Sequence, residues 1–76
     1  MNFDELQKII SEVFNINRKN ITPDLSMKNF SEWDSIGHLN LILALEEKTK
    51  LRFTPEQISS MIDVHSILDE ILKAKN

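Results

Sequence analysis

The chain has 76 residues, of which 41% are hydrophobic, with no cysteine and a formal net charge of -3. A chain of this length predicts one small domain over residues 1–76, and the lack of cysteine excludes disulfides, thiolate zinc sites and a cysteine nucleophile. The basic residues are scattered along an acidic chain, which argues against binding to a nucleic-acid backbone.

The first predicted helix runs from about Phe3 to near Asn15. Asn2 can cap it, and Glu5, three residues later, completes a capping box. Its apolar residues recur every three or four positions, which is typical of a helix with one face on a core. These residues are Phe3, Leu6, Ile9, Ile10, Val13 and Phe14.

A long connection follows from Ile16 to Trp33, with a short turn expected after Pro23. A structureless loop of this length is unusual in a compact domain, so we expect its own apolar residues to pin it to the core. The candidates are Ile21, Leu25, Met27, Phe30 and Trp33.

The second helix is predicted to start at Asp34 or Ser35 and to reach about Thr49. Its apolar residues form a wide stripe, as expected for the most buried helix of a bundle. They include Ile36, Leu39, Ile42, Leu43 and Leu45.

Two further helices complete the chain. Thr54 to Gln57 form a capping box with Pro55 at the first position of a short third helix. Asp63 is expected to cap a last helix with Val64, Ile67, Leu68, Ile71 and Leu72 on one face. We therefore predict an all-α fold, a small bundle of three long helices plus one short helix, with a long loop between helices one and two.

Ser35 stands at the start of the most apolar helix, with Asp34 before it and His38 one turn later. A nucleophilic serine needs a base aimed at its oxygen, a carboxylate that orients the base, and an oxyanion site. Residues on one helical turn cannot easily supply all three, so we expect no enzymatic activity. His38 is expected on the solvated surface, and His65 has no second metal ligand nearby, so no metal site is predicted.

Two interpretations of Ser35 remain open from the residues alone. In the first, Asp34 and Ser35 only cap a helix. In the second, Ser35 carries a covalent modification, because a phosphodiester at a helix N-terminus meets unpaired amide groups and the positive end of the helix dipole.

Asp34-Ser35-Ile36, followed by Leu39 and the run from Leu41 to Glu47, resembles the Asp-Ser-Leu phosphopantetheine attachment motif and second helix of acyl carrier proteins. The resemblance covers nearly the whole chain, because the long first loop and the starts of the third and last helices fall in the family's order.

The resemblance implies that the Ser35 oxygen carries 4'-phosphopantetheine, attached by a phosphopantetheinyl transferase that uses coenzyme A and magnesium. The thiol of this arm would hold acyl or aminoacyl groups as thioesters for partner ligases, synthases or transferases, and the protein would bind and present them. Asp34 would help to orient the attachment site, and Ile36 would be an apolar contact for partners.

Further partner contacts implied by the resemblance are the acidic residues Glu46 and Glu47, together with Asn40 and Trp33. Trp33 has the alternative interpretation of a loop pin, which is more common for an aromatic residue just before a helix. The resemblance also implies a set of residues that line a space for the acyl chain, although simple core packing is the plain interpretation of the same set. This set is Leu39, Ile42, Leu43, Leu45 and Ile62.

Some residues depart from the pattern of fatty-acid carriers. Gly37, His38 and Asn40 occupy a turn that is usually acidic in those carriers, and Lys48 follows the two glutamates. Asp-Ser-hydrophobic-Gly is similar to D-alanyl carriers and to carriers of surface-glycan or secondary-metabolite pathways. We therefore expect a carrier dedicated to a specialised pathway, with a general fatty-acid synthesis carrier and an unmodified helical interaction module as alternatives.

The sequence also gives expectations for the location, assembly and DNA binding of the protein. The acidic N-terminus lacks the features of a signal peptide, and the longest apolar run, Leu41 to Leu45, is far below the ~20 residues that cross a bilayer. We expect a cytoplasmic protein that does not bind membranes. A monomer is the default for a carrier that visits several enzymes, and a helix-turn-helix DNA binder is disfavoured by the negative charge and the apolar second helix.

Overall fold

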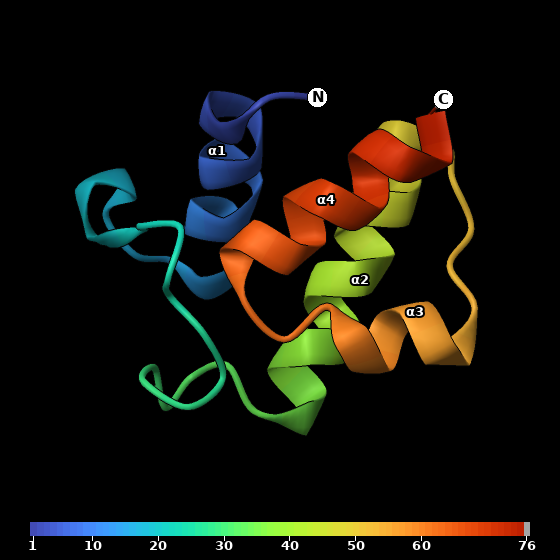
Figure 1. Ribbon diagram of the computed structural model, residues 1–76. Helices are drawn as coiled ribbons and strands as arrows, with labels where there is room; N and C mark the ends of the chain where they lie inside the picture. Colours follow the sequence, from blue (N-terminus) through green and yellow to red (C-terminus); the bar gives the residue numbers. More distant parts are fainter. Residues whose placement is uncertain (76) are drawn as a thin grey trace.

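The computed structural model describes residues 1–75, which form four α-helices, one short 3-10 helix and no strand. The α-helices are α1 (Phe3–Phe14), α2 (Ser35–Thr49), α3 (Pro55–Ser60) and α4 (Val64–Lys75), and the 3-10 helix is η1 (Arg18–Asn20) (Figure 1). The predicted all-α bundle of three long helices and one short one is confirmed. None of the described helices is both long enough and apolar enough to cross a membrane.

The helix boundaries follow from local hydrogen bonds that the sequence predicts. The Asn2 side chain accepts a hydrogen bond from the Glu5 amide at 2.9 Å, and the Glu5 carboxylate accepts one from the Asn2 amide at 3.4 Å. Thr54 and Gln57 form the same reciprocal pair at the start of α3. α1 ends at Phe14 and is capped by Asn15, whose left-handed backbone (φ 54°) is a conformation that asparagine tolerates better than most residues.

The core lies where α1, α2, α4 and the long loop meet. Its buried apolar side chains are Leu6, Ile9, Ile10, Ile21, Trp33, Leu41, Ile42, Leu45, Phe53, Met61, Val64, Ile67 and Ile71. Leu72, predicted on the inner face of the last helix, is instead exposed because it lies near the end of α4, beyond the last fully buried residue, Ile71.

The long loop is pinned as predicted. Ile21 and Trp33 are buried, and three partly buried residues, Leu25, Met27 and Phe30, pack against the core. A hydrogen bond from the Leu25 amide to the Thr22 carbonyl closes the predicted turn after Pro23. The loop also pairs with the segment before α4, through the bonds Met27 N to Ile62 O (3.2 Å), Val64 N to Leu25 O (3.0 Å) and His65 N to Pro23 O (3.0 Å).

The prediction for α2 is wrong for three of its apolar residues. Ile36, Leu39 and Leu43 are 72%, 57% and 62% exposed. The buried face of α2 instead carries His38, Leu41, Ile42 and Leu45. Apolar residues lie on both sides of this helix, and only one side is covered by the rest of the chain, so spacing alone did not identify the inner side.

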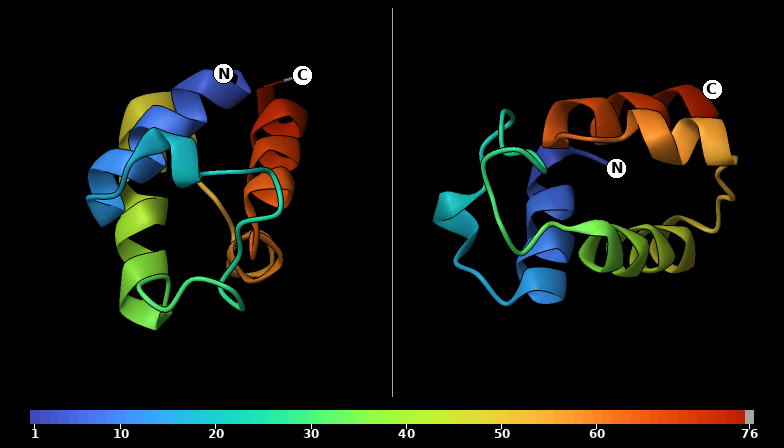
Figure 2. Two further views of the ribbon diagram at one scale, coloured as in Figure 1. Left: turned by 90° about the vertical axis from the view of Figure 1, so that its left-hand side faces the viewer. Right: turned by 90° about the horizontal axis from the view of Figure 1, so that it is seen from below.

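The first turn of α2 lies at the opposite end of the molecule from both chain termini (Figures 1 and 2). In both figures the long loop enters α2 at this end, and the C-terminal half of the chain runs back past the helix through α3 and α4. This arrangement leaves Ser35 at the edge of the bundle.

Candidate functional site

Ser35 is the first residue of α2 and is exposed to solvent. The helix is capped by the residue before it: the Asp34 carboxylate accepts the Gly37 amide at 2.8 Å, and the Asp34 carbonyl accepts the His38 amide at 2.8 Å. Within the described residues the Ser35 hydroxyl forms no hydrogen bond. Because Asp34 does the capping, the Ser35 side chain is not needed to hold the helix and is free to react.

The surroundings of Ser35 suit an anion. The amides of Ser35 and Ile36 have no partner among residues 1–75, since the capping bonds engage only the next two amides. Unpaired amides at the start of a helix of 15 residues carry the positive end of its dipole. A phosphate attached to the Ser35 oxygen would lie beside these groups, so the residues present fit a phosphodiester-linked group.

The turn that bears Ser35 is held in place by close packing at Gly37. A Cβ atom added to Gly37 would lie 2.5 Å from the Glu32 carbonyl oxygen and 2.8 Å from Cε1 of Phe14. The loop and the end of α1 therefore approach the first turn of α2 more closely than any other residue type allows. A lone glycine inside a predicted helix was the available signal for this packing.

The expectation that His38 lies on the solvated surface is wrong. Its side chain is 8% exposed, with Nδ1 3.0 Å from the indole nitrogen of Trp33 and Nε2 2.9 Å from the Ile58 carbonyl oxygen. Sequence spacing gave no sign of these contacts, because Ile58 lies 20 residues further along the chain.

Trp33 is a loop pin and not a surface for partners. It is 1% exposed, and its ring packs against Phe14 with centroids 5.9 Å apart. The expectation that Trp33 contacts partner proteins is therefore wrong, because the core encloses the indole ring completely.

The two glutamates expected at the partner surface, Glu46 and Glu47, lie in different environments. The Glu46 side chain is only 13% exposed, and it accepts the Phe53 amide at 2.9 Å and lies 3.6 Å from Arg52. Glu46 therefore anchors the segment after α2 and is not a free surface charge. Glu47 and Asn40 are exposed, as contacts for a partner would have to be.

The five residues expected to line an acyl-chain site do not meet in one place. Ile42 and Leu45 are buried, which confirms core packing for these two. Leu39, Leu43 and Ile62 are exposed, so core packing is wrong for them. Leu43 lines a surface pocket of about 370 Å³ with Glu46, Glu47, Lys50, Leu51 and Arg52, and none of the other four residues takes part in it.

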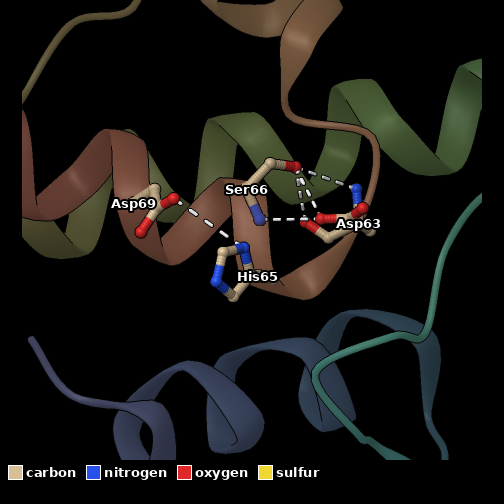
Figure 3. A network of polar contacts seen from close by, with 4 residues as sticks. All are labelled: Asp63, His65, Ser66 and Asp69. Carbon is tan, nitrogen blue, oxygen red and sulfur yellow. Dashed lines mark hydrogen bonds and ion pairs between the residues drawn. The ribbon is translucent and has the colours of Figure 1, made fainter.

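A serine, a histidine and two aspartates gather at the start of α4 (Figure 3). Asp63 Oδ1 accepts both the Ser66 amide and the Ser66 hydroxyl at 2.7 Å, whereas His65 lies 3.7 Å from Asp69 and not against the serine. Two hydrogen bonds lower the pKa of Asp63: the larger effect comes from the Ser66 amide and the smaller from the Ser66 hydroxyl. The group is a helix cap and lacks the serine–histidine contact of a nucleophilic site.

Comparisons with known proteins point to one family. The family model described as "Phosphopantetheine attachment site" matches residues 4–71. The acyl carrier protein of Helicobacter pylori strain J99 is 29% identical over 69 residues, covering 91% of this chain and 88% of that protein. The acyl carrier protein of Phytoplasma mali is 32% identical over 71 residues, covering 93% of this chain and 84% of that protein.

Among solved structures, the fold is similar to that of a holo acyl carrier protein from Geobacter metallireducens. The TM-score is 0.86 at 29% identity, covering 96% of this chain and 84% of that one.

Proposed function

Because this chain belongs to the acyl carrier protein family, whose members carry covalently attached 4'-phosphopantetheine, we propose that Ser35 bears this arm and that the chain serves a specialised biosynthetic pathway. Carriers of this family are not enzymes: the arm supplies a thiol that holds acyl or aminoacyl groups as thioesters, and the protein presents them to other enzymes. The observation that carries the proposal is an exposed serine hydroxyl, free of hydrogen bonds, inside the matched region.

In the proposed attachment reaction, the Ser35 oxygen is the nucleophile. Ser35 Oγ forms a bond to the phosphorus of coenzyme A that carries the pantetheine, and the pyrophosphate bond at that phosphorus breaks. Adenosine bisphosphate leaves with the electron pair, and the hydroxyl proton passes to a base of the phosphopantetheinyl transferase. Asp34 supports the step by capping α2, which fixes the turn without using the serine.

The outer face of α2 is the proposed surface for partner enzymes. It carries the exposed residues Ile36, Leu39 and Leu43, with Asn40 and Glu47 beside them. An apolar side chain buried by a partner contributes about 1.5–3 kcal/mol, whereas exposed ion pairs contribute about 0–1 kcal/mol. Partner binding through this face should therefore depend on apolar contact more than on charge, and salt should weaken it little.

The small contribution of charge at the outer face of α2 supports a dedicated pathway over general fatty-acid synthesis. Glu46, one of the two acids expected on the surface, is engaged by Phe53 and Arg52, which leaves Glu47 as the exposed member of the pair. Enzymes that recognise a cluster of acidic residues on the second helix would find only Glu47 exposed on α2. If purified fatty-acid synthase enzymes load and elongate this carrier as well as their own, the pathway proposal is wrong.

An acyl cargo would be sheltered only if the helices part, because the five candidate lining residues do not meet in one place. Leu39, Leu43 and Ile62 offer exposed apolar surface to an acyl chain, and Ile42 and Leu45 would join them only if the helices part. We propose that the carrier works in the cytoplasm as a monomer, with ligases, synthases or transferases of its pathway as partners.

The proposed function is tested by intact mass after incubation with coenzyme A, magnesium and a broad-specificity phosphopantetheinyl transferase. The parent chain and a Ser59→Ala control, which removes an exposed serine of α3, should each gain one phosphopantetheinyl group. Ser35→Ala should gain none. No gain in a folded parent chain would refute attachment and favour an unmodified helical interaction module.

A further inference from the structure

Trp33, His38 and the Ile58 carbonyl form a buried chain of hydrogen bonds one helical turn from Ser35. The Trp33 indole nitrogen lies 3.0 Å from His38 Nδ1, and His38 Nε2 lies 2.9 Å from the Ile58 oxygen. The chain joins the end of the long loop, the first turns of α2 and the second half of α3. These are the segments whose relative position sets where Ser35 stands.

The geometry selects one form of the imidazole. An indole N–H can only donate, so His38 Nδ1 must present a lone pair, and the proton of the neutral ring must be on Nε2, where it reaches the Ile58 oxygen. A protonated ring carries N–H groups at both positions. It keeps the bond to Ile58 but sets two N–H groups against each other at Trp33, so the two protonation states differ at Nδ1.

We propose that His38 is a positioning residue for the attachment serine. As the neutral Nε2–H form it ties the first turns of α2 to the loop through Trp33 and to α3 through Ile58. Without the imidazole both hydrogen bonds of this tie are lost, and the Ser35 turn loses its fixed position against the loop. Attachment of the arm then slows. The effect on attachment rests on the proposed function, whereas the tautomer does not.

The first test uses the unaltered chain. Nitrogen-15 NMR of the histidine rings should show His38 as a single Nε2–H tautomer at neutral pH, with a coupling across the hydrogen bond between the Trp33 indole N–H and His38 Nδ1. His65, whose ring is exposed, is an internal control and should show both tautomers in exchange. A His38 ring that exchanges tautomers like His65, or a missing coupling between His38 and Trp33, would overturn the proposal.

The second test compares attachment rates of variants at neutral pH. His38→Leu removes both hydrogen bonds of the ring, His38→Gln keeps one acceptor and one donor, and His65→Leu is the matched control at an exposed position. In His38→Leu the kcat/KM for attachment should fall by at least about fivefold, the size of one lost hydrogen bond, and His38→Gln should restore most of the loss. His65→Leu should leave kcat/KM unchanged.

The outcomes separate the two proposals. An unchanged kcat/KM for a folded His38→Leu, or no recovery in His38→Gln, refutes the role of His38. No mass gain in the parent chain refutes attachment itself and leaves the NMR result to decide on the tautomer. If His38→Leu fails to fold, the NMR experiment on the unaltered chain still decides.

Discussion

Replacing Gly37 with alanine tests whether the turn that bears Ser35 is held by close packing. The new Cβ atom would meet the Glu32 carbonyl oxygen at 2.5 Å and Phe14 Cε1 at 2.8 Å. The aromatic ring can rotate away, but the carbonyl belongs to the backbone and can move only with the loop. Overpacking of this kind typically costs about 1–3 kcal/mol.

A second effect opposes the first. Alanine in a helix is favoured over glycine by about 1 kcal/mol. Because one of the two contacts is with backbone, we place the overpacking near the upper end of its range, so that Gly37→Ala loses about 1–2 kcal/mol of unfolding free energy overall. For a domain of this size the Tm should then fall by roughly 5–15 °C.

Thermal unfolding followed by circular dichroism measures this difference. Asn40→Ala is the matched control, because Asn40 lies exposed on the same helix and the change to alanine improves helix propensity by about 0.5 kcal/mol without a clash. Its Tm should rise slightly. A Tm for Gly37→Ala equal to or above that of the parent chain would show that the loop yields freely, and the packing argument would be wrong.

Four further predictions concern stability and binding. The pKa of Asp63 is lowered in the folded chain by the Ser66 hydrogen bonds, so its stabilisation is present above the ordinary value of 3.8 and is lost as the pH falls through the lowered pKa. Asp63→Ala should lose about 1 kcal/mol at neutral pH in urea unfolding, and a smaller amount in strong acid, whereas Asp63→Asn should retain the cap. Trp33→Ala should lose about 3–5 kcal/mol, enough to unfold a domain of this size, and a cooperative urea transition near that of the parent would contradict its burial. Leu45→Ala should lose about 2–5 kcal/mol. Leu43→Ala should change stability by less than about 0.5 kcal/mol but raise the Kd for a partner enzyme by about tenfold, measured by calorimetry; unchanged binding would exclude this face.

Much of the fold was predictable because its signals are local. The caps at Asn2, Thr54 and Asp63 act through side chains that reach only three residues along the chain. Such bonds form in any helix with that sequence, whatever lies around it. The same holds for the start of α2, so the exposed position of Ser35 at its first turn was also predictable.

The sequence alone did not decide which side of α2 faces inward. Leu43 and Leu45 are both leucines on one helix, yet one is exposed and the other is fully buried. A helix with apolar residues on both sides can bury either one, and the choice depends on where α1, α4 and the loop lie.

The tertiary structure also decided the roles of the polar residues near the site. His38 and Glu46 each find a partner that lies beyond their own helix, the Ile58 carbonyl and the Phe53 amide. A histidine or glutamate on a helix can equally be solvated, and only the approach of these backbone groups makes it part of the structure. The amino-acid sequence by itself thus determined the helices, their caps and the exposed position of Ser35, whereas the folded arrangement determined the surface around that serine, because burial and long-range hydrogen bonds depend on segments that meet only when the chain folds.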